Sequence, residues 1–327
     1  MTLRTAPPAV SVIVACHNYG HFLAEALESV RAQSTPDWEC IVVDDGSTDD
    51  TRKVSDRFIS MDPRFRYLHQ PNQGLSAARN AGLGVCTGSY VQLLDADDML
   101  EPGKLEAQVA YLEQHPETDI VYGDVRYFSE AHALPLANDL SKDGRQAMAR
   151  ASGTGPAVLY ALARGNIMVV NAPLLRTTVI DDVGRFDQDL WGHEDWDYWI
   201  RCALAGKRFQ YLDQDSALAL VRVHARSMSQ NLAPMLKSNI QVRRQWQHVL
   251  PPDLRKENTY RIGVLYLEIA KWEFGNGKRL SGMQHAALAV WRSHASIRVV
   301  LRLISLLLPQ AVARRLELAA RRLRILT

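Results

Sequence analysis

The feature that most constrains this fold is a repeated alternation of short apolar runs with helix-forming segments in the first hundred residues. An apolar run of this length is typical of a buried strand. Strands that alternate with helices predict a mostly parallel α/β sheet with helices on both faces. The expected strands are Val10–Ala15, Trp38–Val43, Phe65–His69 and Tyr90–Leu94. The expected helices are Tyr19–Gln33, Thr51–Ser60 and Leu75–Leu83.

The remainder of the chain is predicted to contain further α/β elements and then helices alone. Helices are expected over Pro156–Arg164 and Glu194–Ala205, and strands over Ile167–Val170, Phe209–Leu212 and Leu218–Val223. Residues Asp124–Pro156 have weak periodicity and many small or polar side chains, which predicts a loop. After about Asn231, helical segments alternate with Pro and Gly. We therefore predict an α/β domain over residues 1–230 and an α-helical C-terminal region over residues 231–327.

Composition places the chain among ordinary globular proteins. It has 327 residues, of which 47% are hydrophobic and 23% are charged. This balance excludes a disordered chain and a small disulfide scaffold. The four cysteines are widely spaced and form no CxxC pair, which predicts reduced thiols. No apolar run approaches the roughly 18 residues of a spanning helix, and the N-terminus is unlike a signal peptide. We therefore expect a cytoplasmic protein.

Positive charge is concentrated at the C-terminus. The net charge is +2, yet residues 292–327 contain eight Arg and one acid, so this tail carries +7 and the remainder −5. The tail also has apolar side chains at helical spacing. A basic amphipathic helix too short to span can lie on an anionic membrane, which predicts peripheral contact with the inner face of the cell membrane. The alternative is a helix that packs on the protein with solvated arginines. We expect no nucleic-acid partner.

Acidic side chains follow two of the predicted strands. Asp44 and Asp45 end one strand, and Asp95, Asp97 and Asp98 follow another. The carboxyl ends of parallel strands share one edge of a sheet, where ligands bind. Carboxylates at alternating positions can hold Mg²⁺ together with substrate phosphates. The alternative is a turn or a helix N-cap, for which Asp is also favoured.

Three other segments carry candidate functional residues. Arg79 lies on a short helix between the two acidic strand ends, where a surface arginine is the alternative. Glu194 and Asp195 open a helix, where the helix dipole alone also favours acids, and successive helical residues point about 100° apart. Both carboxylates therefore cannot aim at one atom, so one could act as a general base while the other orients a ligand or caps the helix. His224 follows the predicted strand Leu218–Val223, a position that suits a metal or phosphate role; the alternative is a structural histidine.

Taken together, these motifs resemble the family 2 inverting glycosyltransferases with the GT-A fold. The resemblance covers about residues 9–230 and places its motifs in the family's order. They are VSVIVACHNYGHFL, IVVDDGSTDDT, NQGLSAARNAG, YVQLLDADD, DDVGRFDQDLWGHEDWDYWIR and VRVHARSMSQ. One departure is CHNY, where the family more often has a tyrosine before the asparagine.

The resemblance implies a role for each matching residue. The nucleotide-sugar site would comprise Ala15, His17, Asn18, Asp45, Arg79, Asp95 and Ala96. Asp45 would accept a hydrogen bond from a ring nitrogen of a uracil-like base. Arg79 would contact the base or a phosphate, and Asp95 would bind the ribose. Asp97, the end of a DXD motif, would ligate Mn²⁺ or Mg²⁺, with His224 touching the metal or diphosphate. Asp195 would be the catalytic base, supported by Glu194.

The implied function is transfer of a sugar from a nucleotide-diphosphate sugar, most commonly a UDP-sugar, to a hydroxyl of a glycan or lipid-linked acceptor. This is the chemistry of cell-surface polysaccharide or glycoconjugate synthesis. A sugar nucleotidyltransferase is one alternative, although CHNYGHFL lacks the Gly-rich, Arg-containing loop of that class. A non-catalytic nucleotide-sugar binding module is the other. Such a module would tolerate loss of Asp97 or Asp195, and both are present.

Overall fold

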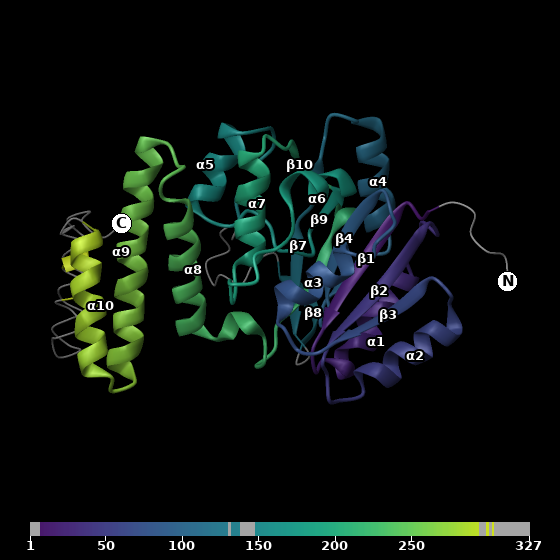
Figure 1. The fold of residues 1–327 in the computed structure, drawn as a ribbon, viewed down its shortest axis with the longest axis horizontal. Coiled ribbons are helices and arrows are strands. Elements are labelled where there is room, and N and C mark those ends of the chain that lie inside the picture. Colours follow the sequence, from purple (N-terminus) through teal and green to yellow (C-terminus); the bar gives the residue numbers. More distant parts are fainter. Residues whose placement is uncertain (1–6, 130–131, 138–147, 294–298, 301–302, 304–327) are drawn as a thin grey trace. The chain divides into compact units, whose positions relative to one another are not determined.

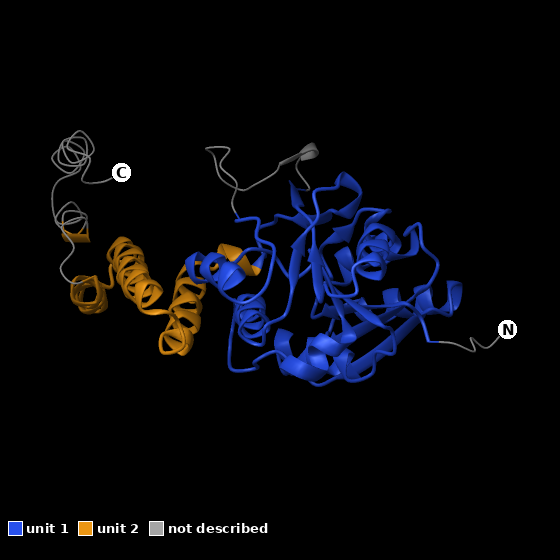
Figure 2. Ribbon diagram, turned by 90° about the horizontal axis from the view of Figure 1, so that it is seen from above, with its two compact units in different colours: residues 1–227 blue, residues 228–327 orange. Residues whose placement is uncertain are grey.

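The computed structural model describes residues 7–129, 132–137, 148–293, 299–300 and 303. It divides into two compact units, residues 1–227 and residues 228–327, which are described separately (Figure 2). Most of the predicted basic tail, residues 296–327, lies outside the described residues. Among the residues that are described, no helix combines the length and the apolar character needed to cross a membrane.

A seven-stranded sheet with strand order β10-β6-β9-β4-β1-β2-β3 forms the centre of the first unit (Figure 1). Its strands are β1 (Val10–Cys16), β2 (Trp38–Asp45), β3 (Phe65–Gln70), β4 (Tyr90–Asp95), β6 (Ile120–Tyr122), β9 (Pro173–Arg176) and β10 (Phe209–Tyr211). Neighbouring strands are parallel except at β9, which is antiparallel to both β4 and β6. The structure therefore confirms the predicted mostly parallel α/β sheet.

A smaller four-stranded sheet has the order β5-β11-β7-β8. Its strands are β5 (Met99–Leu100), β7 (Val125–Ser129), β8 (His132–Ala137) and β11 (Ala219–Arg222). β11 is parallel to β7 and antiparallel to β5. Because β5 directly follows the acidic residues after β4, and β11 ends two residues before His224, this sheet brings those two segments together.

Helices cover both faces of the large sheet because successive strand residues point to opposite faces. One face carries α1 (Gly20–Arg31) and α2 (Thr51–Met61), where Val12 and Val14 share a core with Leu23 and Leu27. The other face carries α3 (Leu75–Leu83). A Cβ at Gly82 of α3 would lie 2.4 Å from Cγ2 of Ile13, so glycine permits this close approach.

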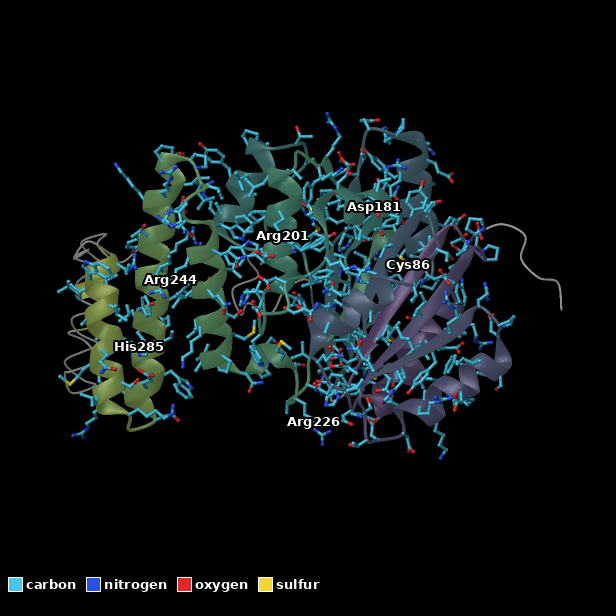
Figure 3. All side chains as sticks on the ribbon, viewed as in Figure 1. Cys86, Asp181, Arg201, Arg226, Arg244 and His285 are labelled. Carbon is cyan, nitrogen blue, oxygen red and sulfur yellow. The ribbon has the colours of Figure 1, made fainter. Side chains whose placement is uncertain are left out.

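Four further helices complete the described part of the first unit. They are α4 (Lys104–Gln114), α5 (Pro156–Arg164), α6 (Thr177–Val183) and α7 (Glu194–Leu204), with a short 3₁₀ segment, η1, at Asp215–Ala217. Trp196 and Trp199 of α7 are both buried in the core. Arg201 of the same helix, labelled in Figure 3, donates from Nε to Oδ2 of the buried Asp197 at 2.9 Å.

Two sequence predictions within this unit are wrong. The expected loop Asp124–Pro156 contains β7 and the backbone of β8, two short strands whose sequences lack a clear alternating pattern. The expected strand Ile167–Val170 is not a strand, and the sheet instead includes β9, a few residues later. Ile167 and Val170 are buried, so their apolar character reflects core packing and not membership of a ladder.

The described part of the second unit is helical. It contains a 3₁₀ turn, η2 (Met228–Gln230), followed by α8 (Leu232–Trp246), α9 (Pro252–Gly275) and α10 (Arg279–Arg292). α9 contacts both of the other helices. Gly263 marks the crossing of α9 with the end of α10, because a Cβ there would lie 2.8 Å from the backbone nitrogen of Ser293. His285 of α10, labelled in Figure 3, has Nδ1 2.7 Å from Oε2 of Glu273 on α9.

All four cysteines are free thiols in the structure. Cys16, Cys40 and Cys202 are buried, and Cys86, which is labelled in Figure 3, is half-buried. Burial raises the pKa of Cys16 to about 11, so its thiol stays protonated near neutral pH. These thiols suit a reduced state, in agreement with their spacing in the sequence.

Candidate functional site

The carboxyl ends of β4, β1, β2 and β3 meet at one edge of the large sheet, which we call the rim. β1 lies between β2 and β4. The chain reaches β2 through α1 on one face and β4 through α3 on the other, which creates a topological switch point beside β1. Ala15 pairs with both Val43 and Asp95. The predicted residues Ala15 and Asp95 are therefore neighbours at the position where parallel α/β sheets bind ligands.

Hydrogen bonds join the loop after β1 to the loop after β2. Asn18 has a φ of 56°, its backbone N–H donates to Ser47 Oγ at 2.9 Å, and its Oδ1 accepts from the N–H of Thr48 at 2.8 Å. Nδ1 of His17 lies 2.8 Å from the carbonyl oxygen of Asp45, so Nδ1 donates. The His17 side chain is exposed and accessible to a ligand.

Asp45 fixes the segment between β3 and α3. Its Oδ1 accepts from Nε2 of Gln70 at 2.7 Å and from the N–H of Gln73 at 2.9 Å, and its Oδ2 accepts from the N–H of Gly74 at 2.8 Å. A carboxylate oxygen has two lone pairs, so this contact leaves Oδ2 capacity for another donor. The geometry is compatible with the base contact that the resemblance implies.

Arg79 joins the end of β4 to the start of α7. Its side chain is 3% exposed, and its guanidinium donates to Glu194 Oε1 and, at 2.7 Å, to Asp95 Oδ1. Burial alone would lower the pKa of Arg79, but Asp95 and Glu194 outweigh burial and raise it. The guanidinium therefore remains charged and offsets the repulsion between two carboxylates at the rim.

Asp97 and His224 form a second pair at the rim. His224 Nε2 lies 3.0 Å from Asp97 Oδ2, while Nδ1 accepts from the N–H of Arg226, labelled in Figure 3, at 3.2 Å. In this tautomer Nε2 carries the hydrogen and donates to Asp97. Burial, followed by the charge of Asp95, raises the pKa of Asp97, and His224 opposes that shift.

The pair fits a divalent cation. Mg²⁺ lies 2.0–2.1 Å from its ligands in an octahedral shell, so adjacent ligand atoms are about 3 Å apart. The distance between Asp97 Oδ2 and His224 Nε2 matches this spacing. Binding through Nε2 would move the ring hydrogen to Nδ1 and end the contact with Arg226. No cluster of three or more potential ligand side chains occurs among the described residues. Oxygen atoms of a bound nucleotide sugar would therefore have to complete the coordination shell.

Two residues that were not singled out as ligands in the sequence, Asn171 and Arg222, hold the acidic segment in place. Asn171 accepts from the N–H of Asp95 at 2.9 Å and donates to Asp98 Oδ2. The N–H of Arg222 donates to Asp98 Oδ1 at 2.7 Å, and its Nε donates to the carbonyl oxygen of Asp97 at 2.8 Å. Asp98 is thus a structural anchor, and Ala96 beside it is buried. Asn171 follows an ordinary apolar run, and no sequence motif distinguishes it.

Glu194 and Asp195 direct their carboxylates to different partners, as their helical positions require. Glu194 accepts from Arg79. Asp195 Oδ2 accepts from Nδ2 of Asn166 at 2.9 Å, and its Oδ1 accepts from the N–H of Trp196 at 2.7 Å. Burial, then the charge of Glu194, raises the pKa of Asp195 to about 7, with Arg79 acting in the opposite direction. A carboxylate with this pKa can exchange a proton near neutral pH.

Comparison with known proteins agrees with the family resemblance. Residues 11–160 match the family model described as Glycosyl transferase family 2, which confirms the resemblance over that segment. Glycosyltransferase GlyG from Streptococcus pneumoniae is 36% identical over 123 residues, which cover 37% of this chain and 40% of GlyG. An uncharacterized protein, y4gI, from Sinorhizobium fredii is 32% identical over 205 residues, covering 60% of this chain and 20% of that protein. This chain spans less than half the length of these relatives.

Solved structures show the fold. A crystal structure of S. aureus TarS residues 1–349 has a TM-score of 0.59 and 17% identity, covering 87% of this chain and 80% of that one. The mannosyltransferase PcManGT from Pyrobaculum calidifontis, solved with GDP-Man and Mn²⁺, has a TM-score of 0.60 and 20% identity, covering 88% and 76%. TarS 1–349 has also been solved with UDP-GlcNAc, with a TM-score of 0.58 and 15% identity, covering 87% and 92%. The chain has the GT-A fold.

Proposed function

We propose that this chain is an inverting glycosyltransferase that moves a sugar from a nucleotide-diphosphate sugar to a hydroxyl of a glycan or lipid-linked acceptor. UDP-sugars are the first donors to test, since TarS binds UDP-GlcNAc and family 2 enzymes commonly use such donors. GDP-sugars come next, because PcManGT binds GDP-Man. The proposed setting is the synthesis of cell-surface polysaccharide or glycoconjugate.

The Arg79 bridge is the observation that carries this proposal. One guanidinium contacts Asp95 at the end of β4 and Glu194 at the start of α7. The segment proposed to hold the donor diphosphate and the helix that carries the proposed base are therefore neighbours at one rim. A transferase needs both groups close enough to act on a single reacting carbon.

The proposed reaction is a single displacement. Asp195 accepts the proton of the acceptor hydroxyl, whose oxygen forms a bond to the anomeric carbon. The bond from that carbon to the diphosphate oxygen breaks on the opposite face, and the diphosphate leaves with the electron pair. Attack opposite to the leaving group inverts the configuration, so no covalent sugar–enzyme intermediate is needed. A cation bound by Asp97 and His224 would supply positive charge beside the leaving diphosphate.

Donor binding can be tested by the thermal stability of the full chain with UDP, dTDP or GDP, each with and without Mn²⁺. A ligand that binds only the native state raises its melting temperature. Asp97→Ala should abolish the Mn²⁺-dependent part of this increase. Asp215→Ala is the matched control, because the Asp215 side chain is 98% exposed. An unchanged Mn²⁺ effect in Asp97→Ala would contradict the metal assignment.

Turnover separates the proposed enzyme from a binding module. Asp195→Asn keeps the size of the side chain but removes its proton acceptance, so turnover should fall roughly 100-fold or more while donor binding persists. If Glu194→Gln abolishes turnover and Asp195→Asn does not, the two roles are exchanged. Binding without sugar transfer would support a binding module. Release of pyrophosphate from a nucleoside triphosphate and a sugar phosphate would support a nucleotidyltransferase.

Peripheral membrane contact through residues 296–327 is part of the proposal, supported by the charge and apolar spacing of that sequence. Each basic residue close to anionic lipid contributes about 1 kcal/mol. The full chain should therefore sediment with vesicles that contain anionic lipid, and salt should weaken this binding. A chain that ends near Ser293 should remain in the supernatant. Equal sedimentation of the two chains would contradict the assignment.

A further inference from the structure

The end of α5 is fixed beside the start of α7. Trp196 of α7 is buried, and its Nε1 donates to the carbonyl oxygen of Leu162 on α5 at 2.9 Å. Leu162 is itself buried. Asn166 lies just beyond the C-terminus of α5. The packing of these two helices therefore determines where the Asn166 side chain can reach.

Asn166 contacts the carboxylate that the proposed function makes the base. Its Nδ2 donates to Asp195 Oδ2 at 2.9 Å, and its Oδ1 lies 3.4 Å from the N–H of Met168, which agrees with this orientation of the amide. The N–H of Trp196 donates to the other oxygen, Oδ1. With one donor on each oxygen, the plane of the carboxylate is fixed, while each oxygen keeps capacity to accept from a substrate hydroxyl.

We propose that Asn166 is a positioning residue for proton acceptance by Asp195, a role that rests on the proposed function. Its amide holds Oδ2 in place and stabilises the charged carboxylate relative to the neutral acid. It does so without adding charge to a location where Glu194 already repels Asp195 and Arg79 attracts it. Removing this donor should leave Asp195 present but protonated over a wider range of pH.

The test is the pH dependence of sugar transfer by the full chain. A lost hydrogen bond to a charged group corresponds to a shift of roughly one pH unit, so the acid limb of the kcat/KM profile, which reports the free enzyme, should move upward by about that amount in Asn166→Ala. With a starting pKa of about 7 for Asp195 in the free enzyme, the reduction in kcat/KM should be about fivefold at pH 7 and less than twofold near pH 9. The donor KM should change little.

Two variants sharpen the test. Asn166→Asp replaces the donor with a second carboxylate, so its acid limb should move further than that of Asn166→Ala. Asn276→Ala replaces an exposed asparagine in residues 228–327 and should leave the profile unchanged. A kcat/KM that falls by the same factor at every pH in Asn166→Ala would mean a purely structural role and overturn the inference.

Failure of the inference can be distinguished from failure of the proposed function. If Asp195→Asn retains wild-type turnover, the base assignment fails. If Asp195→Asn is inactive and Asn166→Ala matches wild type, only the role of Asn166 fails. Carbon-13 NMR titration of the Asp195 carboxyl, assigned by its absence in Asp195→Asn, gives a readout that needs no turnover. An unchanged titration midpoint in Asn166→Ala would overturn the inference even if no donor is found.

Discussion

Replacing Arg79 with Met would test whether the rim depends on a buried cation. Met retains much of the length and apolar stem of Arg but removes the charge and the donors. Two carboxylates would then lose their shared partner, and that of Glu194 is only 8% exposed. The Asp95 side chain, at 31% exposure, can recover part of its loss by hydration.

The size of the effect follows from this burial. Removing one partner of a buried ion pair costs about 3–5 kcal/mol, because the remaining charge stays desolvated. For a domain of this size, such a loss lowers the melting temperature by roughly 6–20 °C. Since the pKa of an ordinary arginine is already far above neutral and that of Arg79 is raised further, its charge persists at every pH that the folded protein tolerates. The stabilisation should therefore not titrate away through Arg79 itself.

Thermal denaturation of Arg79→Met beside Arg52→Met measures this effect against a matched control. Arg52 pairs with Asp56 on the surface of α2, where the side chains are 63% and 52% exposed, so that variant should remain close to wild type in stability. Adding Glu194→Gln should cost less in the Arg79→Met background than in wild type, because the two residues are coupled. If the two arginine variants are equally stable, the rim does not depend on Arg79.

Three further predictions concern packing and protonation. Gly82→Ala places a Cβ 2.4 Å from Ile13 and should lower the free energy of unfolding, measured in urea, by about 1–3 kcal/mol. Gly275→Ala in α9 is the control, because its Cβ meets no atom within 4 Å and should stabilise the protein slightly. Equal stabilities of the two variants would contradict the close approach of α3 to β1. Burial lowers the pKa of Lys104 well below its usual 10.5, so between that lowered pKa and 10.5 the unfolded chain binds more protons than the native state. Over this range the stability of the wild type should rise with pH by up to about 1.4 kcal/mol per pH unit. Lys104→Met should lose this dependence on pH. The raised pKa of Asp195 has the opposite effect on stability, because the native state binds more protons than the unfolded chain between about pH 4 and 7. As the pH rises through that range, wild-type stability should fall relative to that of Asp195→Asn. The same dependence of stability on pH in the two proteins would refute the shift.

The sequence predicted the first half of the large sheet well because its strands are buried on both faces. β1, β2 and β4 are mainly apolar, and their predicted bounds differ from those in the structure by only one or two residues. α4 was not predicted, and its inner face explains why. Lys104 and Gln108 are fully buried there, with Lys104 Nζ donating to Gln92 Oε1 at 2.5 Å and to Gln108 Oε1 at 2.7 Å. Polar residues on the inner face remove the amphipathic pattern that marks a helix.

The candidate site was predictable where polar residues follow strands and much less so where they follow irregular backbone. Asp45, Asp95 and Asp97 stand at strand ends, and the topology alone places them at one rim. Asn166 and Asn171 lie in a segment whose position depends on how α5 and β9 pack. A side-chain amide has no sequence signature for a role as a donor to a carboxylate. Such residues are recognised only after tertiary structure has brought them to their partners.

The direction of β9 has a consequence for altering this protein by loop exchange. The residues that follow a parallel strand lie at the rim. Because β9 is antiparallel to β4, the residues that precede β9 lie there instead. Pairing of Gln92 with Leu174 sets this orientation, so the chain from Gly165 to Ala172 approaches the rim before entering the sheet. Loop grafts intended to alter the rim therefore belong before Pro173 and must keep Asn166 and Asn171, whereas grafts after Arg176 would remodel the opposite edge.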